Sequence, residues 1–575
     1  MFERAAAKPV QIPSVTIDGW HVDYRIHSIT KSGKEIRLEP KVMEVLSCLA
    51  ERSGEVVTRQ ELEATVWAGR IVTVDALTST VAKLRRVFGD DARKPRVIET
   101  IPKVGYRLSA AVTLSSPDSV SEQRRSPLNV LQQRYITQWV IVLAVVFVSA
   151  ALLLWLLLTR DATRNPPDGA VSHPDENPAI VVLPFENLSA DSEENYFAAG
   201  ITADLITELS SFSGLFVIAP HTAFSYFENN KTERVIGSEL GVRYVLIGTV
   251  RRSNDGLIIT ARLTDALNDR VLWAERYQRD LNDLFQIQSE VAGIILSALS
   301  VKLAPGEHNQ LSKRYTTNSE AYDQLLRGRD YYARRSKWDN DTAKAHFEQA
   351  IRLDPGFARA FTSLALAHLR DSIDGWSDDP HYSLGRAEQL VEDALLLDES
   401  IPQVFFAQSQ VALFRRNYEQ AIDAAKKAIA LEPNYADAYA LLAWVLNYAG
   451  RVDQALEAMQ TALRLNPQVP SVYLTVQGGI FYMLRRYDMA AQNFTQALEL
   501  NPTTQRLRLW ATAAYAKAGL IDEAEWEAEE LYALNPELSL NDIIQSFPFR
   551  DPQHMDHLLV GLRRAGLYHN QGISD

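Results

Sequence analysis

The sequence of 575 residues contains a single cysteine, Cys48, and none of the short motifs that mark common enzymes. One thiol excludes a disulfide framework and a zinc site built from cysteines of this chain. Gly237 and Gly241 form neither a dinucleotide-binding nor a phosphate-binding loop, and no Ser/His/Asp set is legible. Hydrophobic residues make up 46% and charged residues 23%, which excludes a chain disordered throughout. We therefore predict a multidomain globular protein that is not an enzyme and has no cofactor or metal site.

Charge is divided unevenly along the chain. Residues 1–138 hold 21 basic and 16 acidic residues, whereas the remainder holds 38 basic and 56 acidic residues. A basic first part and an acidic second part indicate two different partners or compartments.

Residues 139–158 separate these two parts and contain no charge, no proline and no glycine. A helix of roughly 20 residues spans about 30 Å, the thickness of the hydrocarbon core of a bilayer. The run therefore predicts a single transmembrane helix with membrane lipid as a partner, flanked by linkers at residues 109–138 and 161–178. Arginines are in slight excess before the run, which favours a bacterial inner-membrane protein with a cytoplasmic N-terminus and a periplasmic C-terminal region.

Residues 14–108 predict a compact α+β domain. Short β-rich segments come first, followed by helices at residues 41–52, 58–67 and 76–88 and by a hairpin at residues 96–108. Thr58 and Glu61 have the spacing of a capping box at the start of the second helix. In the third helix the apolar residues recur at helical spacing, which predicts a core face made of Leu77, Val81, Leu84 and Phe88. Helices followed by a basic hairpin are the order of a winged helix-turn-helix.

The opposite face of the third helix carries hydroxyls near its start and cations after them. Its predicted contact residues are Thr78, Ser79, Lys83, Arg85 and Arg86. An α-helix fits the major groove of DNA, where such side chains meet base edges and phosphates. Double-stranded DNA is therefore the predicted partner of this domain.

Two segments carry a resemblance to a known family. Leu84-Arg85-Arg86 and the hairpin from Ile98 to Leu108 resemble the OmpR/PhoB-type winged helix, and in particular its membrane-anchored ToxR/CadC branch. The resemblance implies base contacts by Thr80 and Lys83, and phosphate contacts at or beside Arg85 and Arg86.

The same resemblance extends to the loop and the wing. It places Trp67 in the loop before the recognition helix and Thr100 at the base of the wing. Pro102-Lys103 stands where many members of the family have Arg-Gly, so this sequence departs from the pattern that inserts a wing into the minor groove. Lys103 is the residue expected to supply the charge there.

Residues 179–302 alternate apolar strands with helices, which predicts an α/β domain that acts as a sensor. The segments 184–188, 196–201 and 244–250 resemble the TolB amino-terminal-type domain of bacterial regulators. Acidic residues at positions 191, 193 and 194 fit the start of a helix, which attracts negative charge, better than a metal site.

Residues 318–540 repeat a helix ending of the form Leu-x-Pro. It recurs at Pro433, Pro467, Pro502 and Pro536, at intervals of 34, 35 and 34 residues. This period resembles tetratricopeptide repeats and predicts an all-α superhelix, with a C-terminal helical cap at residues 541–575. Such arrays bind a protein or peptide in a groove or associate with a second copy, and the sequence leaves both open.

These parts favour a membrane-anchored one-component transcriptional regulator. A periplasmic sensor and interaction region would control promoter binding by a cytoplasmic winged helix, and self-association would hold two winged helices at adjacent half-sites. The alternative is an envelope scaffold whose repeats recruit a partner and whose N-terminal domain does not act on DNA. Replacing Lys83 and Arg86 by alanine distinguishes the two, because only the regulator would lose its promoter response.

Overall fold

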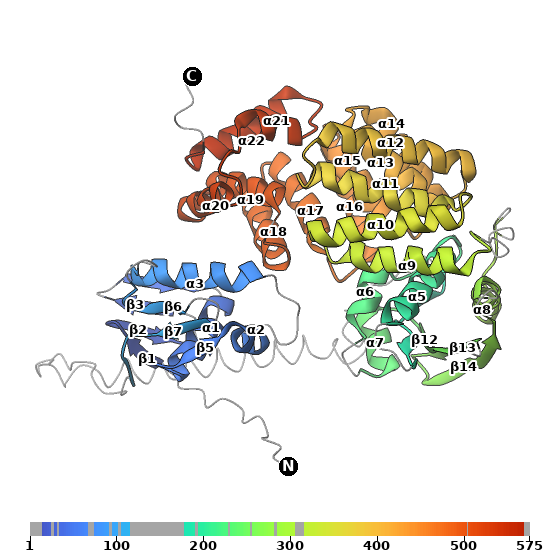
Figure 1. The fold of residues 1–575 in the computed structure, drawn as a ribbon, viewed down its shortest axis with the longest axis horizontal. Helices are drawn as coiled ribbons and strands as arrows, with labels where there is room; N and C mark the ends of the chain where they lie inside the picture. Colours follow the sequence, from blue (N-terminus) through green and yellow to red (C-terminus); the bar gives the residue numbers. More distant parts are fainter. Residues whose placement is uncertain are drawn as a thin grey trace, which may run out of the picture. The chain divides into compact units, whose positions relative to one another are not determined.

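A computed structural model describes residues 14–24, 28–31, 34–38, 40–66, 74–90, 95–101, 105–114, 177–189, 194–227, 231–253, 256–280, 284–304, 307, 315–502 and 504–567. They belong to two compact units, one within Met1–Trp155 and the other within Leu156–Asp575. Figure 1 shows the helices and strands of each.

The described residues of the first unit form two antiparallel sheets and three helices. One sheet has the strand order β4-β3-β2-β1-β8 and the other the order β5-β7-β6. The strands are β1 (Ser14–Ile17), β2 (Trp20–Asp23), β3 (Ser28–Lys31), β4 (Lys34–Arg37), β5 (Val56–Thr58), β6 (Ile98–Ile101), β7 (Gly105–Leu108) and β8 (Val112–Leu114). The helices are α1 (Pro40–Glu51), α2 (Arg59–Val66) and α3 (Val74–Phe88). The predicted winged helix is present, and β8 adds to it a strand that the sequence assigns to a linker.

The local signals read from this part of the sequence are confirmed. The Thr58 hydroxyl accepts a hydrogen bond from Glu61 N at 3.2 Å, and Glu61 Oε2 accepts one from Thr58 N at 2.9 Å, which completes the capping box. The bonds from the Thr58 backbone and side chain hold the pKa of Glu61 at about 2. The predicted core face of α3 is buried, with Leu77 and Leu84 fully inaccessible.

The predicted transmembrane helix is corrected by the structure. Within the described ranges, no helix is long and apolar enough to cross a bilayer. The longest of these helices, α12 (Pro380–Leu397), carries four charges, and charged groups are costly in hydrocarbon. The predicted span at residues 139–158 lies outside the described residues. The inner-membrane location and the lipid partner expected from that span are therefore not retained.

The second unit begins with the expected α/β domain. Its sheet has the strand order β11-β9-β12-β13-β14, and β10 also pairs with β12. β9, β10 and β11 run parallel to their neighbours, whereas β12, β13 and β14 form an antiparallel meander. The elements are β9 (Ala179–Val182), β10 (Glu186–Asn187), α5 (Asn195–Ser210), β11 (Phe216–Val217), α6 (Pro220–Ser225), α7 (Glu233–Leu240), β12 (Tyr244–Ser253), β13 (Gly256–Asp265), β14 (Arg270–Arg279) and α8 (Leu284–Ala298).

Paired helices follow, as the 34-residue period predicts. They are α9 (Ser319–Ala333), α10 (Lys337–Leu353), α11 (Ala358–Ile373), α12, α13 (Pro402–Phe414), α14 (Tyr418–Leu431), α15 (Ala436–Tyr448), α16 (Val452–Leu465), α17 (Ser471–Met483), α18 (Tyr487–Leu500), α19 (Gln505–Ala518) and α20 (Ile521–Leu534). The second helix of every pair ends at a leucine, and α21 (Leu540–Ser546) and α22 (Pro552–Arg564) close the array.

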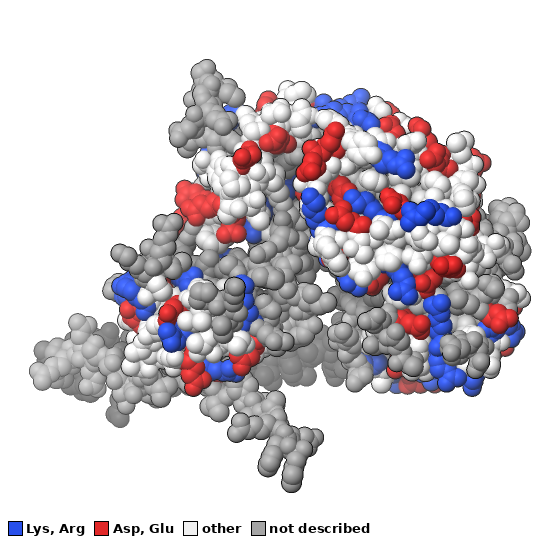
Figure 2. All heavy atoms as spheres, in the orientation of Figure 1, with Lys and Arg blue, Asp and Glu red and all other residues white. Residues whose placement is uncertain are grey.

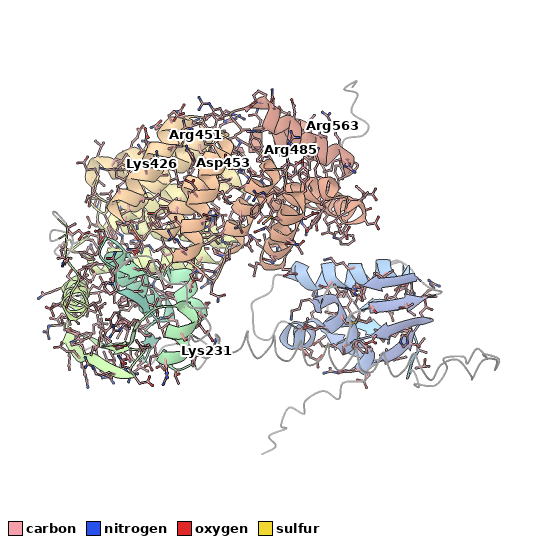
Figure 3. The ribbon with its side chains drawn as sticks, turned by 180° about the vertical axis from the view of Figure 1, so that it is seen from behind. Lys231, Lys426, Arg451, Asp453, Arg485 and Arg563 are labelled. Atoms are coloured by element: carbon pink, nitrogen blue, oxygen red, sulfur yellow. The ribbon has the colours of Figure 1, made fainter. Side chains whose placement is uncertain are left out.

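Charges on the repeats are mixed in sign. Figure 2 shows basic and acidic side chains interspersed over the helices on the face it presents. Basic residues also stand at turns between paired helices, where Arg451 precedes α16 and Arg485, two residues before α18, has a positive φ of 59° (Figure 3).

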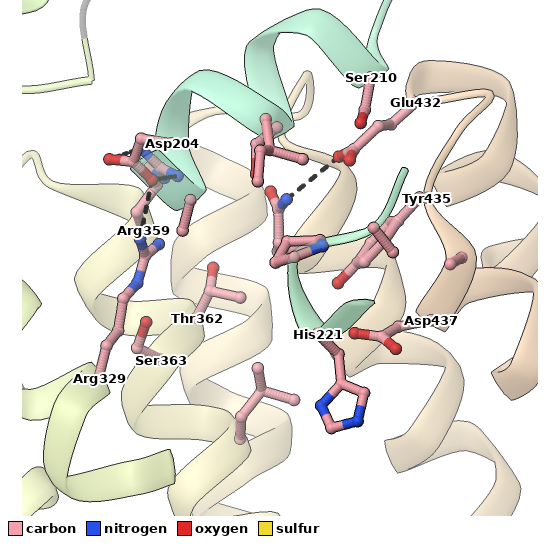
Figure 4. Close-up of a pocket in the computed structure, with 18 of the residues that line it drawn as sticks. Asp204, Ser210, His221, Arg329, Arg359, Thr362, Ser363, Glu432, Tyr435 and Asp437 are labelled. Atoms are coloured by element: carbon pink, nitrogen blue, oxygen red, sulfur yellow. Dashed lines mark hydrogen bonds and ion pairs between the residues drawn. The ribbon is translucent and has the colours of Figure 1, made fainter. Parts of the chain in front are cut away.

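The α/β domain and the first repeats share one hydrophobic core. Ile201 and Leu205 of α5 belong to the same buried cluster as Leu325 and Leu326 of α9. A cavity of about 280 Å³ lies at this junction, between α5, α6 and the facing repeat helices (Figure 4). The predicted α/β domain and the first repeats are thus packed together as parts of one compact unit.

Two asparagines from the repeat endings hold the α/β domain at this junction. Asn434 Nδ2 donates to the carbonyl of Leu215 at 2.8 Å. Asn466 Oδ1 accepts from the backbone N of Thr222 at 3.1 Å and from its hydroxyl at 2.7 Å. Thr222 and Asn466 are both buried, so their polar groups must find partners within the protein. The two bonds therefore specify how the α/β domain docks on the repeats.

Candidate nucleic-acid interface

Helix α3, the predicted recognition helix, carries six of the predicted contact residues, and the structure describes the side chains of Thr80, Lys83 and Arg85 among them. Thr78, Ser79 and Arg86 lie on the helix, and their side chains lie outside the described part of the structure, as do residues Trp67 and Lys103 altogether. Lys83 is half-buried and Thr80 is buried, with 7% of its surface exposed. Thr80 therefore lies toward the core side of α3, although the resemblance places it among the base contacts.

Arg85 connects the recognition helix to the wing. Its guanidinium donates to the carbonyl of Ile98 through Nε at 3.2 Å and Nη2 at 2.9 Å, and Nη2 also donates to Thr100 Oγ1 at 2.7 Å. Ile98 and Thr100 belong to β6, the first strand of the wing. Arg85 and Thr100, each predicted separately as a DNA contact, thus bond to each other.

A second link between α3 and the wing is not predicted from the sequence. Asp90 Oδ1 accepts from Arg96 N at 2.6 Å, and Asp90 Oδ2 accepts from Ile98 N at 2.8 Å. The preceding Gly89 has a positive φ of 61°, which ends the helix and turns the chain toward the wing. A Gly-Asp pair directly after a helix is the signal that could have revealed this turn.

The wing itself is a two-stranded hairpin with fixed register. Thr100 pairs with Tyr106 and Ile101 pairs with Gly105, and β7 also pairs with β5. Arg107 Nη2 and Glu99 Oε2 lie 2.5 Å apart, so Arg107 forms an ion pair across the hairpin. Together, Arg85, Asp90 and this register hold the wing at a set angle to α3.

Three parts of the chain match known families. Residues 33–108 match the family described as "Transcriptional regulatory protein, C terminal", and residues 176–294 match "HilA/YgeH-like transcriptional regulator, second domain". Residues 413–478 match "Tetratricopeptide repeat". The α/β domain, predicted to resemble a TolB-type domain, thus matches a HilA-like family.

The individual relatives include a transcriptional activator. The transcriptional activator CadC of Escherichia coli K12 is 24% identical over 517 residues, which cover 82% of this chain and 96% of that protein. The solved DNA-binding domain of E. coli CadC is 34% identical and covers 18% of this chain and 100% of its own, with a TM-score of 0.17.

A third relative carries the name of an enzyme. "Putative adenylate cyclase 3" of Rhizobium meliloti is 39% identical over 271 residues, which span 47% of this chain and 46% of that protein. The matched families are nevertheless those of transcriptional regulators. The chain carries an OmpR/PhoB-type regulatory domain, a HilA-like domain and tetratricopeptide repeats, and is homologous to regulators of the CadC and ToxR type.

Proposed function

We propose that the protein regulates transcription by placing α3 in the major groove of promoter DNA, with the β6–β7 wing beside it. The observation that carries this proposal is the bonding of Arg85 to Ile98 and Thr100 within the matched regulatory domain. A helix and a wing that are already held at a set angle can bind one duplex together, because no free energy is spent on ordering them during binding.

The proposal gives the predicted contact residues different roles. Thr78, Ser79, Lys83 and Arg86 would contact the duplex from α3, and Trp67 and Lys103 would do so from the loop and the wing. Thr80, Arg85 and Thr100 would act as positioning residues, because Thr80 is buried and the other two are bonded to each other.

The second unit would control this binding through association. Tetratricopeptide repeats are interaction modules, and a partner or second copy held there would raise the effective concentration of paired winged helices at adjacent half-sites. Nothing in this step requires catalysis.

The test begins with mapping the DNA that the tagged full-length chain occupies in cells. The recovered fragments are then titrated with purified protein at several salt concentrations. Specific binding should weaken steeply with salt, because phosphate contacts release counterions. The double variant Lys83→Ala and Arg86→Ala should lose occupancy of the DNA. The control is Lys31→Ala, which removes a cation of strand β3 that bonds to Asp18, and it should retain occupancy. Unchanged occupancy in the double variant would favour the scaffold function.

A further inference from the structure

The last helices of the repeat array meet in a closely packed junction. Tyr482 of α17 donates a hydrogen bond to the carbonyl of His557 of α22 at 2.9 Å, and the two rings are stacked 4.7 Å apart. Tyr487, the first residue of α18, bonds to Nε2 of His557 at 2.9 Å. A Cβ added to Gly561 of α22 would stand 2.9 Å from the Cβ of Ala513, so α22 also lies directly against α19. The ends of α17, α19 and α22 therefore lie near this junction.

Each of these three helix ends carries a cation. Arg485 follows α17 on the turn before α18, Lys517 lies in the last turn of α19, and Arg564 is the last residue of α22. Arg485 and Arg564 are exposed and Lys517 is half-buried, so all three have surface open to solvent. The exposed Arg563, beside Arg564, adds a fourth positive charge (Figure 3).

These cations act on one another without a counter-charge. Burial lowers the pKa of Lys517, and the charges of Arg564 and Arg485 lower it further. Burial also lowers the pKa of His557 to about 4, with added contributions from Lys517 and Arg485. Within the part of the chain that the structure describes, the side chains of Arg485, Lys517 and Arg564 form no ion pair and no hydrogen bond. The described residues thus leave this positive charge unneutralised.

Two arginines at the turns of earlier repeats are, by contrast, bonded within the protein. Arg416 has nearly the same backbone conformation as Arg485, with φ values of 62° and 59°, and it donates to the carbonyl of Phe549 at 3.2 Å. Arg451 pairs with Glu419 at 2.7 Å. The attraction of cations to helix C-termini does not balance the junction, because each helix end carries only about half a negative charge. Three ends offset roughly one and a half of the four positive charges.

The number and kind of these cations favour a phosphate group over a carboxylate. A phosphate monoester carries a charge of about −1.5 to −2 at pH 7 and presents three acceptor oxygens, whereas a carboxylate carries a single charge. Guanidinium groups bond to phosphate through paired N–H groups, and an ammonium such as that of Lys517 supplies a point charge. Cations that stand at three different helix ends can each bond to a different oxygen.

We propose that this junction binds a phosphate group through Arg485, Lys517 and Arg564, with Arg563 as an additional charge. The group is either free inorganic phosphate or the phosphate ester of a small metabolite, since both present the same oxygens. This site is separate from the proposed DNA-binding function and does not depend on it.

The experiment measures binding to the full-length protein by isothermal titration calorimetry at neutral pH and constant ionic strength. Inorganic phosphate and glycerol 3-phosphate are each titrated and compared with acetate, a carboxylate of single charge. We expect phosphate to bind at one site and acetate to bind at least roughly tenfold more weakly. Tighter binding of inorganic phosphate would identify the free ion as the ligand, and tighter binding of glycerol 3-phosphate would identify a phosphate ester.

Variants of the exposed cations locate the site. Arg485→Gln combined with Arg564→Gln should weaken phosphate binding roughly tenfold or more, because charge-assisted bonds are lost. Lys517→Gln should weaken it independently, and it keeps the proposal testable if the double variant does not fold. The control Arg464→Gln removes an exposed cation of α16 that bonds to Thr461, and it should leave binding unchanged.

Two results would overturn the proposal. The first is equal binding of phosphate and acetate, or unchanged phosphate binding in the variants of the junction. The second is a parent protein that binds neither phosphate, combined with a double variant that loses affinity for DNA. That result would assign these cations to the nucleic-acid backbone instead.

Discussion

Arg359 of α11 donates from Nη2 to Asp204 Oδ1 of α5 at 2.7 Å, with both side chains 5% exposed or less. The two residues are 155 positions apart in the chain and belong to the repeats and the α/β domain respectively. Arg329 also bonds to Asp204, at 2.9 Å, and Figure 4 shows both arginines directed at the carboxylate. Burial alone would raise the pKa of Asp204, but the two guanidinium charges lower it to about 2.

Asp204→Asn should destabilise the second unit by about 3–5 kcal/mol, because it leaves a buried arginine without its counter-charge. Equilibrium denaturation followed by tryptophan fluorescence measures this cost. The matched control is Asp330→Asn, which removes an exposed ion pair with Arg334 and should cost under about 1 kcal/mol. Equal costs for the two variants would contradict a structural role for the buried pair.

Glu432→Gln should change how stability depends on pH. Burial, opposed by the charge of Arg359, raises the pKa of Glu432 to about 8, whereas an unfolded glutamate titrates near about 4.3. The folded state prefers the protonated form, so its stability is greatest below the unfolded pKa and falls as pH rises to about 8. In the glutamine variant the free energy of unfolding should decrease less as the pH rises. At pH 8 the variant should be more stable than the parent by on the order of a few kcal/mol.

Melting temperatures at pH 5, 6.5 and 8 measure the effect. Burial also raises the pKa of Glu208 to about 8, so a residual slope should persist in the single variant and shrink in the double variant with Glu208→Gln. Parallel pH profiles for parent and variants would show that neither carboxyl is neutral in the folded protein.

Arg85→Lys should weaken DNA binding about tenfold although it preserves the charge. A lysine cannot make the three bonds that the guanidinium makes to Ile98 and Thr100, so the wing loses its fixed angle to α3. The slope of log affinity against log salt should stay unchanged. Arg86→Ala should instead lower that slope by about 1, as expected for a lost phosphate contact. A reduced slope in Arg85→Lys would indicate that Arg85 contacts a phosphate directly.

Gly478→Ala should destabilise the repeats by about 1–3 kcal/mol. A Cβ at this position of α17 would stand 2.6 Å from Cε1 of Phe494, a fully buried side chain of α18. Gly293→Ala is the control, since a Cβ there meets nothing within 4 Å on helix α8. That change should stabilise the protein by about 0.5–1 kcal/mol, because glycine weakens a helix interior. Thermal unfolding distinguishes a loss from a gain.

Local signals in the sequence are sufficient for much of this architecture. The capping box at Thr58 and Glu61 depends on residues three positions apart, and the bonds that form it are present. The repeat endings are also local, and α14, α16, α18 and α20 end at the leucines that the pattern gives. Such features follow from spacing alone.

Long-range contacts are not readable in this way. Nothing near Asp204 in the sequence indicates Arg359, and nothing near Asn434 indicates that it bonds to Leu215. In the candidate interface, the charge of Arg85 predicts a DNA contact. In the structure its guanidinium bonds to Thr100 of the wing instead. Chemistry at a position predicts what a side chain can bond, whereas the tertiary fold decides which partner it meets.

The short strand β8 joins the end of the winged-helix unit to its five-stranded sheet. Val112, Thr113 and Leu114 pair in antiparallel register with Ile17, Thr16 and Val15 of β1. Tension reaching residue 114 from the rest of the chain is therefore borne by the hydrogen bonds of the five-stranded sheet. The hairpin of β6 and β7 belongs to the other sheet of this unit, so a displacement passed to β8 acts first on the sheet that does not contain the wing.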